Sequence, residues 1–132
     1  MSQDNVEIVL AAYEHLNRGD VDALIALCDD DFLMDMSERV FNPDTYRGSH
    51  ELRRFYDGVQ SAWNTYRWTV EQTRAVDDAV VAMVHCRGQG RDGGPWAEWQ
   101  VAWLWQLRGQ RLVSVRFFRD PPHALEAVGL QD

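Results

Sequence analysis

The spacing of apolar residues along the chain changes near residue 66. Before this point, apolar residues recur every three or four positions, which indicates amphipathic helices. From Tyr66 onward they recur at every second position, which is typical of strands with one buried face. Helices followed by an antiparallel sheet predict an α+β fold.

Three helices and a short strand are predicted in the first half of the chain. Ser2 is expected to cap the first helix, and Gly19 suits the left-handed position that ends it. Asp20 then caps the second helix and Ser49 caps the third. The first helix ends in the segment 17–19, the second spans residues 21–28, the third spans residues 49–63, and the strand spans residues 32–36.

Four consecutive strands and a closing helix are predicted in the second half. The strands span residues 66–76, 79–87, 96–107 and 111–118. The turns between them are short, so we expect these strands to be antiparallel neighbours. Pro121 and Pro122 end the last strand, and residues 123–128 predict a short helix.

Length, composition and charge exclude several classes of protein. The chain has 132 residues, of which 45% are hydrophobic and 26% are charged, and this fits one folded domain over residues 1–132. The net charge is −8, so nucleic acid, a polyanion, is not an expected partner. No stretch approaches the roughly 20 apolar residues that cross a bilayer, and the N-terminus has no secretory pattern. We therefore expect a cytoplasmic protein with no membrane partner.

Neither a metal nor a cofactor is expected. The sequence has no His-x-x-x-His, His-Glu-x-x-His or Cys-x-x-Cys motif, which are common metal-binding patterns. Cys28 and Cys86 lie in apolar stretches and are expected to be buried free thiols. The glycine-rich segment 88–94 joins two predicted strands, whereas a dinucleotide fingerprint joins a strand to a helix.

The strand over residues 96–107 carries the clearest candidate binding surface. Its alternation places Trp99, Val101, Trp103 and Trp105 on one face. Three indoles on one face suit the wall of a pocket for a flat, hydrophobic molecule. They suit a tryptophan-rich core or a dimer face equally well, because apolar stripes are usually core.

One carboxylate and two tyrosines are candidates for acid–base chemistry. Asp35 lies in the apolar strand 32–36, where burial would raise its pKa toward that of a useful base; an exposed aspartate on an edge strand is the alternative. Tyr13 and Tyr56 lie on apolar helix faces, from which each hydroxyl can reach a cavity as a donor. A core tyrosine whose hydroxyl reaches the rim is the other interpretation.

The order of the elements and several local strings resemble the nuclear transport factor 2-like superfamily, and within it the SnoaL-like group. The matching strings are residues 17–24, 46–48, 74–76, 88–91, 103–108 and 124–130. The resemblance implies a cone-shaped α+β fold, in which a curved antiparallel sheet wraps around three N-terminal helices, with a short C-terminal helix. Polyketide cyclases belong to this group, and ketosteroid isomerases and epoxide hydrolases are functional relatives.

The resemblance also implies which residues line a pocket on the concave face of the sheet. Arg119, at the end of the last strand, is then placed near the pocket mouth, where it holds an anionic group or forms an ordinary surface ion pair. The expected ligand-binding residues are Trp63, Trp99, Val101, Trp103, Trp105, Val115, Phe117 and Arg119.

Isomerase chemistry of the ketosteroid type is not expected. Without gaps, the pattern of that enzyme places its base at Met36, its tyrosine at Ala12 and its neutral acid at Trp103. Asp35 and Tyr13 each miss the pattern by one residue, and such a slip in a strand turns a side chain to the opposite face.

Three functions remain open at this point. The first is an enzyme that acts on a small hydrophobic, cyclic molecule by isomerase, cyclase or hydrolase chemistry, with Asp35 as base and Tyr13 or Tyr56 as donor. The second is a non-catalytic protein that binds such a molecule in the same pocket, and the third is a protein–protein adaptor.

The opposite face of the sheet suits a homodimer interface because it mixes polar and apolar residues. Dimerisation through this face is also frequent in the superfamily that the chain resembles. The residues of this predicted interface are Glu98, Gln100, Ala102, Leu104, Gln106, Ser114, Arg116 and Phe118.

Overall fold

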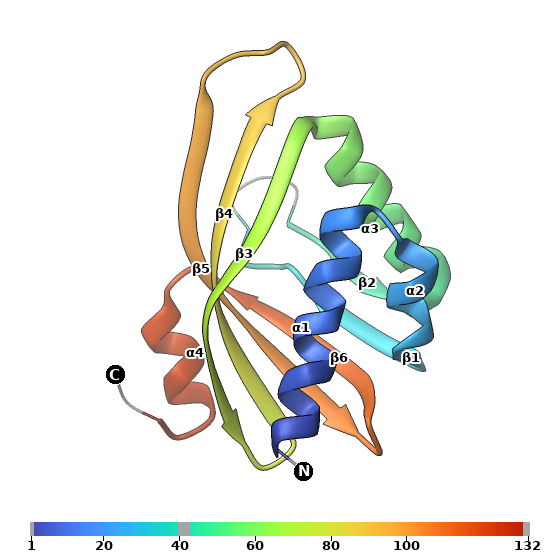
Figure 1. Cartoon of the computed structure of the whole chain (residues 1–132), viewed down its shortest axis with the longest axis vertical. Coiled ribbons are helices and arrows are strands. Elements are labelled where there is room, and N and C mark those ends of the chain that lie inside the picture. Colours follow the sequence, from blue (N-terminus) through green and yellow to red (C-terminus); the bar gives the residue numbers. More distant parts are fainter. Residues whose placement is uncertain (1, 40–42, 131–132) are drawn as a thin grey trace.

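The computed structural model describes residues 2–39 and 43–130. A six-stranded sheet carries three helices on one face and a fourth helix on the other (Figure 1). This confirms the α+β class. The elements are α1 Ser2–Arg18, α2 Val21–Ala26, β1 Cys28–Asp35, β2 Thr45–Arg47, α3 Gly48–Ala62, β3 Trp63–Val76, β4 Ala79–Gly90, β5 Trp96–Arg108, β6 Arg111–Phe118 and α4 Pro121–Ala127.

The sheet is mixed rather than purely antiparallel. Its strand order is β2-β1-β6-β5-β4-β3, and strands β3 to β6 form the predicted antiparallel series. The pair β1–β6 is parallel, which corrects the expectation of a fully antiparallel sheet. A long connection through α3 and four strands, β2 to β5, separates β1 from β6, so no tight turn forces these two strands to run in opposite directions.

The turn between α1 and α2 follows the predicted chemistry. Gly19 has a φ of +75°, the left-handed conformation that glycine adopts without strain. Asp20 caps α2, because its carboxylate accepts a hydrogen bond of 3.1 Å from the Ala23 N–H. A Cβ at Gly19 would lie only 2.6 Å from the hydroxyl oxygen of Tyr56 on α3. The glycine therefore also allows α3 to approach this turn.

Several boundaries differ from the prediction. Helix α3 begins at Gly48 without a side-chain cap, so Ser49 is not its cap; instead, the carboxylate of Glu51 accepts a hydrogen bond of 2.6 Å from the Arg47 N–H. Helix α2 ends at Ala26, and Cys28 already belongs to β1. The predicted cap at Ser2 lies outside the described side chains.

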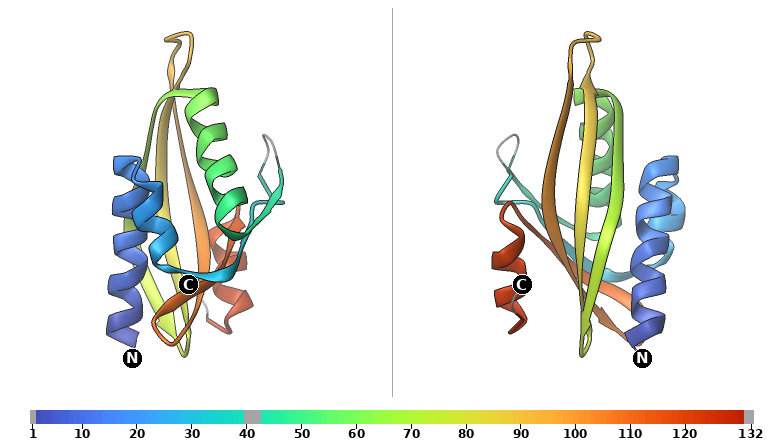
Figure 2. Two further views of the ribbon diagram at one scale, coloured as in Figure 1. Left: turned by 90° about the vertical axis from the view of Figure 1, so that its right-hand side faces the viewer. Right: turned by 60° about the vertical axis from the view of Figure 1, so that its left-hand side comes forward.

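Two hydrophobic clusters occupy the two faces of the sheet, and Figure 2 shows α1 to α3 on one side of it and α4 on the other. The larger one lies between the concave face and helices α1, α2 and α3. The smaller one lies under α4, whose Ala124 and Leu125 pack against Ala102, Leu104 and Phe118. Helix α4 therefore covers three residues of the predicted dimer face.

A side chain from α1 forms hydrogen bonds with the outer backbone edge of β3. The amide nitrogen of Asn17 donates a hydrogen bond of 2.8 Å to the Trp68 carbonyl, and its amide oxygen accepts one of 2.9 Å from the Trp68 N–H. Unpaired backbone groups at a sheet edge invite pairing with another chain. Asn17 thus replaces the missing neighbour of β3 at this residue and holds α1 against the sheet.

Candidate functional site

The concave face of the sheet holds two groups of aromatic rings in mutual contact. The rings of each group have centroids between 4.6 and 6.4 Å apart, distances at which aromatic pairs attract one another. The Tyr13 group consists of Tyr13, Phe32, Trp103 and Trp105. The Tyr66 group consists of Trp63, Tyr66, Trp68 and Trp99.

Small residues on β4 make room for these rings. Ala82 lies opposite Trp103 on β5, and Gly88 lies opposite Tyr66 on β3. A Cβ at Gly88 would lie 2.8 Å from a ring carbon of Trp63, closer than packed carbon atoms approach. The sequence of β4 therefore determines where the indoles of the neighbouring strands can lie.

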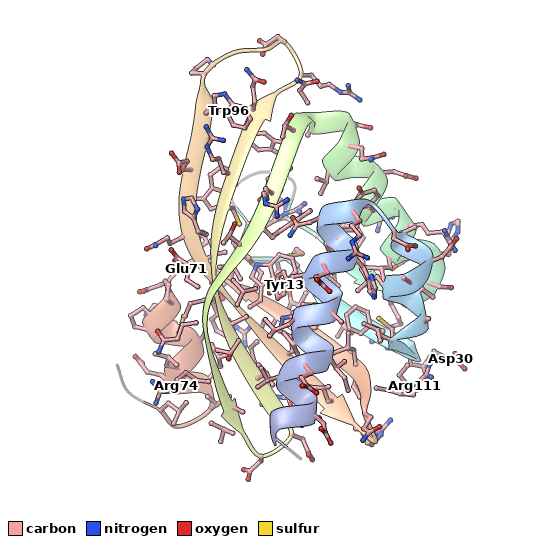
Figure 3. The ribbon with its side chains drawn as sticks, viewed as in Figure 1. Tyr13, Asp30, Glu71, Arg74, Trp96 and Arg111 are labelled. Carbon is pink, nitrogen blue, oxygen red and sulfur yellow. The ribbon has the colours of Figure 1, made fainter. Side chains whose placement is uncertain are left out.

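The Tyr13 group contains two hydrogen-bond donors at short range. Tyr13 is 2% exposed, and its hydroxyl accepts a hydrogen bond of 3.0 Å from the Trp105 indole N–H. Figure 3 shows Tyr13 between α1 and the sheet. Burial raises the pKa of Tyr13 well above its ordinary value, so the hydroxyl keeps its proton and remains a donor.

The second donor is the indole N–H of Trp103. Trp103 is 3% exposed, and its ring centroid lies 5.4 Å from that of Tyr13. Its Nε1 is buried and has no hydrogen-bond partner among the described residues. A buried N–H without a partner costs about 1–3 kcal/mol, so this donor is a place where a ligand oxygen would be stabilised.

Cys86 on β4 lies between the two groups. Its thiol shares a hydrogen bond with the Tyr66 hydroxyl, and burial raises the pKa of the Cys86 thiol to about 11. Burial also raises the pKa of Tyr66. Both groups are therefore neutral at pH 7, and the thiol is not a nucleophile.

A cavity of about 240 Å³ lies beside the Tyr66 group, between the C-terminal ends of α1 and α3 and the start of β3. Tyr56, Trp63, Tyr66 and Trp68 contribute rings to its lining, and Asn17, Gln60 and Asn64 contribute amides. The lining therefore combines aromatic rings with several polar groups that can orient a ligand. The volume is just below the range of about 300–1,000 Å³ usual for drug-sized ligands, so it suits a small ligand.

A larger cavity of about 450 Å³ lies elsewhere, between α2, β1 and the start of α3. Figure 3 shows Asp30 and Arg111, which line it, at the edge of the molecule and away from Tyr13. Two of its charged groups already have partners: Arg111 donates to the Cys28 carbonyl, and Asp29 lies 3.6 Å from Arg108. We therefore place the candidate site at the aromatic groups, of which the Tyr66 group borders the smaller cavity.

Asp35 lies on the convex face of the sheet, away from the aromatic groups. Its neighbours Met34 and Met36 are buried on the concave side, and its partner across the sheet, Arg116, lies over the Phe118 ring on the convex face. Hydrogen bonds from the hydroxyl and amide of Ser37, together with the charge of Arg116, lower the pKa of Asp35 despite partial burial. The expectation of a raised pKa is therefore wrong.

The two candidate tyrosines have different environments. Tyr13 is buried in the core, whereas Tyr56 is half-buried and lines the smaller cavity. The hydroxyl of Tyr56 accepts a hydrogen bond of 3.2 Å from the Gln60 amide. The structure thus places neither hydroxyl beside Asp35.

The expected ligand-binding residues divide into three sets. Trp63 lines the smaller cavity and contacts Trp99. Arg119 is exposed beyond the end of β6 and lines neither of the two cavities. The other expected residues belong to the concave core; they are Val101, Trp103, Trp105, Val115 and Phe117.

Three residues of this site were missed by the sequence analysis. Tyr66 and Trp68 share a face of β3, and their alternation within the predicted strand was a usable signal. Arg39 reaches the same interior from a turn after β1, where its guanidinium carbon lies 5.5 Å from the centre of the Phe55 ring. No periodic pattern marks a side chain that enters from a turn.

The described residues hold no cluster of three or more histidine, cysteine, aspartate or glutamate side chains suited to a metal ion. Within the same part of the chain, no helix is both long and apolar enough to cross a membrane.

The fold is an α+β sheet-and-helix cone with an aromatic interior. The chain belongs to the SnoaL-like domain family, whose model matches residues 9–115. Among curated proteins, none matches the sequence significantly.

Solved structures show the same fold at low sequence identity. An NTF2-like protein of unknown function from Burkholderia pseudomallei is 18% identical with a TM-score of 0.78, over 96% of this chain and 98% of that one. TerC, co-crystallised with polyporic acid, is 16% identical with a TM-score of 0.78, over 95% and 97%. RV0760c from Mycobacterium tuberculosis, in complex with estradiol-17beta-hemisuccinate, is 16% identical with a TM-score of 0.75, over 89% and 94%.

Proposed function

We propose that this protein binds a small, flat and largely apolar molecule that carries an oxygen acceptor. The rings of the Tyr66 group provide the apolar contact, and the Trp103 N–H and Tyr13 hydroxyl receive the oxygen. The observation that carries the proposal is the buried Trp103 N–H without a partner among the described residues. Two further observations support it: the smaller cavity lies beside Tyr66, and two solved structures of the same fold, TerC with polyporic acid and RV0760c with estradiol-17beta-hemisuccinate, hold ring-containing ligands.

Binding is favoured over acid–base catalysis because the site has no evident base. None of the fully buried side chains that the structure describes is a carboxylate or a histidine. Asp35 lies on the other face, with a lowered pKa. Isomerase, cyclase or hydrolase chemistry therefore stays a prediction without a supporting contact.

The test uses two probes that differ only in an acceptor. Naphthalene has none, and acetylnaphthalene adds a ketone oxygen. By calorimetry, we expect the native chain to bind acetylnaphthalene more tightly than naphthalene. The variant Trp103→Phe keeps an aromatic ring but removes the N–H, so it should bind acetylnaphthalene about tenfold more weakly, the effect of one buried hydrogen bond.

The matched control is Trp96→Phe, because Trp96 is 43% exposed and lies on the protruding β4–β5 hairpin (Figure 3). This variant should bind both probes as the native chain does. Absence of binding for both probes, or equal loss in the two variants, would contradict the proposal.

We also propose a homodimer through the part of the convex face that α4 leaves uncovered. This strip carries paired polar groups: His85 lies 2.9 Å from Glu98, and Gln100 donates to Glu71 at 2.8 Å. Trp96 lies at its upper end, with the guanidinium of Arg87 3.9 Å from its ring centre. A mixed polar and aromatic surface of this kind is typical of protein interfaces.

A further inference from the structure

The hydroxyl of Tyr13 is held on one side by Trp105. Trp105 is fully buried on β5, and its indole N–H donates a hydrogen bond of 3.0 Å to the Tyr13 oxygen. The two rings meet edge to face, at 80° with centroids 5.5 Å apart, and the Trp105 ring also stacks on Phe32 and on Trp103. These contacts fix the direction from which the N–H approaches the hydroxyl.

The hydrogen bond from Trp105 determines what Tyr13 can offer to a ligand. A tyrosine hydroxyl has one proton to donate and an oxygen that accepts. Because the oxygen already accepts from Trp105, a ligand that approaches from the other side meets the proton. Among the described residues, this proton has no acceptor. Tyr13 is therefore a donor toward the interior.

Trp103 provides a second donor beside Tyr13. The centroids of their rings lie 5.4 Å apart, and the buried Nε1 of Trp103 has no partner in the part of the chain that the structure describes. An oxygen with two lone pairs can accept from both groups at once.

Groups that could accept a proton from a ligand are scarce in this interior. The Tyr66 hydroxyl and the Cys86 thiol are bonded to each other. The buried amide of Asn5 belongs to the same helix as Tyr13 but lies about 12 Å from it along the axis. His15 has a buried Nδ1, but it follows Tyr13 by two residues and therefore points about 200° away around the helix. A ligand hydroxyl that enters would thus leave its own proton without a partner.

We propose that Trp105 determines which kind of oxygen the site takes: it occupies the Tyr13 oxygen, turns the Tyr13 proton toward the ligand, and so selects a carbonyl over a hydroxyl. This inference rests on the proposed function and names the oxygen of its ligand. Trp105 is a positioning residue, because it acts on the ligand through Tyr13. A carbonyl accepts from Tyr13 and Trp103 and has no proton of its own, whereas an alcohol would bury an unpaired donor, which is unfavourable.

The experiment compares acetylnaphthalene with naphthylethanol, the secondary alcohol that has the same rings and carbon skeleton. By calorimetry, we expect the native chain to bind the ketone about tenfold more tightly, the effect of one buried donor without an acceptor. Trp105→Phe keeps a ring but frees the Tyr13 oxygen to accept from the alcohol, so the two affinities should become nearly equal. A merely structural role of Trp105 would weaken both probes and leave their ratio at the native value.

Two controls separate the hydrogen bond from the packing of the indole. Trp96→Phe removes an exposed indole far from Tyr13 and should keep the native ratio. In a Tyr13→Phe background no hydroxyl oxygen is left to free, so the addition of Trp105→Phe should leave the ratio unchanged. A ratio that falls equally with and without the Tyr13 hydroxyl overturns the proposal.

The remaining outcomes also decide. Equal affinity of the native chain for the two probes overturns this inference and leaves the proposed function standing, whereas binding of neither probe overturns the proposed function itself. A native ratio in folded Trp105→Phe overturns the role of Trp105. If that variant does not fold, Tyr13→Phe alone decides: weaker binding of the ketone supports Tyr13 as a donor, whereas a loss confined to the alcohol, or no loss, overturns the inference.

Discussion

Two small residues on β4 determine where the aromatic rings of the interior can lie. Gly88 lies under the rings of Trp63 and Tyr66, and Ala82 lies beside Trp103. Bulky rings on β3 and β5 fit on one concave face only because the strand between them presents small groups to both. Protein interiors are close-packed, so one added methyl group at such a position is felt.

Gly88→Ala should therefore lower the free energy of unfolding by about 1–3 kcal/mol, the usual effect of overpacking. The added Cβ would lie 2.8 Å from the Trp63 ring and 3.2 Å from the Tyr66 ring. Urea denaturation measures the change. Gly58→Ala is the control. Gly58 lies at an exposed position of α3, and no atom lies within 4 Å of its Cβ position. This substitution should therefore raise the free energy of unfolding by about 1 kcal/mol through helix propensity. A Gly88→Ala chain as stable as the native one would refute this packing account.

The carboxylate of Asp35 should contribute to stability in a pH-dependent way. The Ser37 hydrogen bonds lower its folded pKa, so its contribution is present above the ordinary aspartate value of about 3.9 and disappears as the pH falls through the folded value. Asp35→Asn should thus be slightly less stable than the native chain at pH 7 and equally stable at strongly acidic pH. Denaturation at the two pH values measures this, with exposed Asp57→Asn as control; a difference that grows toward acid would be the wrong sign.

Elements are held together by contacts that replace missing neighbours. β3 has no strand on its outer side, and Asn17 from α1 supplies a donor and an acceptor to Trp68 there. Because the same asparagine borders the smaller cavity, the joint between α1 and β3 also forms one wall of the candidate site.

Asn17→Ala should lower the free energy of unfolding by about 1–3 kcal/mol, because it leaves the backbone N–H and carbonyl of Trp68 without these hydrogen-bond partners. Hydrogen exchange of the Trp68 amide should become faster in this variant. Asn64→Ala provides the comparison, since Asn64 makes only a 3.4 Å exposed hydrogen bond to Gln89 and its loss should change stability little. Equal effects of the two substitutions would show that the edge of β3 needs no partner.

Most elements could be predicted because their apolar residues repeat with a clear period. The strands β3 to β6 and the helices α1 to α4 were all expected, with boundaries that differ by a few residues. The three-residue strand β2 is too short to show a period. The parallel pairing of β1 with β6 depends on contacts between residues that are far apart in the sequence, which local patterns do not record.

The candidate site could be predicted only in part. The alternation along β5 correctly indicated that Trp99, Trp103 and Trp105 share the concave face. The sequence left the orientation of Asp35 open between a buried base and an exposed edge-strand residue, although its neighbours Met34 and Met36 alternate with it and occupy the core. Which indole N–H lacks a partner depends on three-dimensional contacts, and no sequence pattern contains that information.

The whole molecule has two unlike faces. The concave face is closed by three helices, whereas α4 covers only the lower part of the convex face and leaves the strip that ends at Trp96 (Figure 1). Two large apolar side chains of the described part are substantially exposed, Trp96 at 43% and Leu10 at 40%. Only Trp96 belongs to that strip. Substitutions at Trp96 and Leu10 can therefore be compared to test whether the protein associates through the strip.

The homodimer proposal predicts a particle of twice the chain mass of 15.3 kDa in sedimentation equilibrium. Trp96→Glu should shift the equilibrium toward the monomer, because it places a charge in a contact where charged residues are depleted. Leu10→Glu, on α1 of the other face, should leave the mass unchanged. A native chain that sediments as a monomer at high concentration, or a Leu10→Glu variant that alone dissociates, would contradict the interface.

The parallel pairing of β1 with β6 has a consequence for the synthesis of this protein. Residues 36–110 lie between the two strands, so β1 gains this neighbour only after most of the chain has left the ribosome. Contacts between distant residues form late and slow folding. Until then the apolar faces of α1 and α3 have no complete sheet to cover them, and such nascent surfaces are the targets of chaperones. A ribosome that stalls before β6 should therefore hold a chain that chaperones bind, whereas one that stalls after α4 has emerged should hold a closed domain that they ignore.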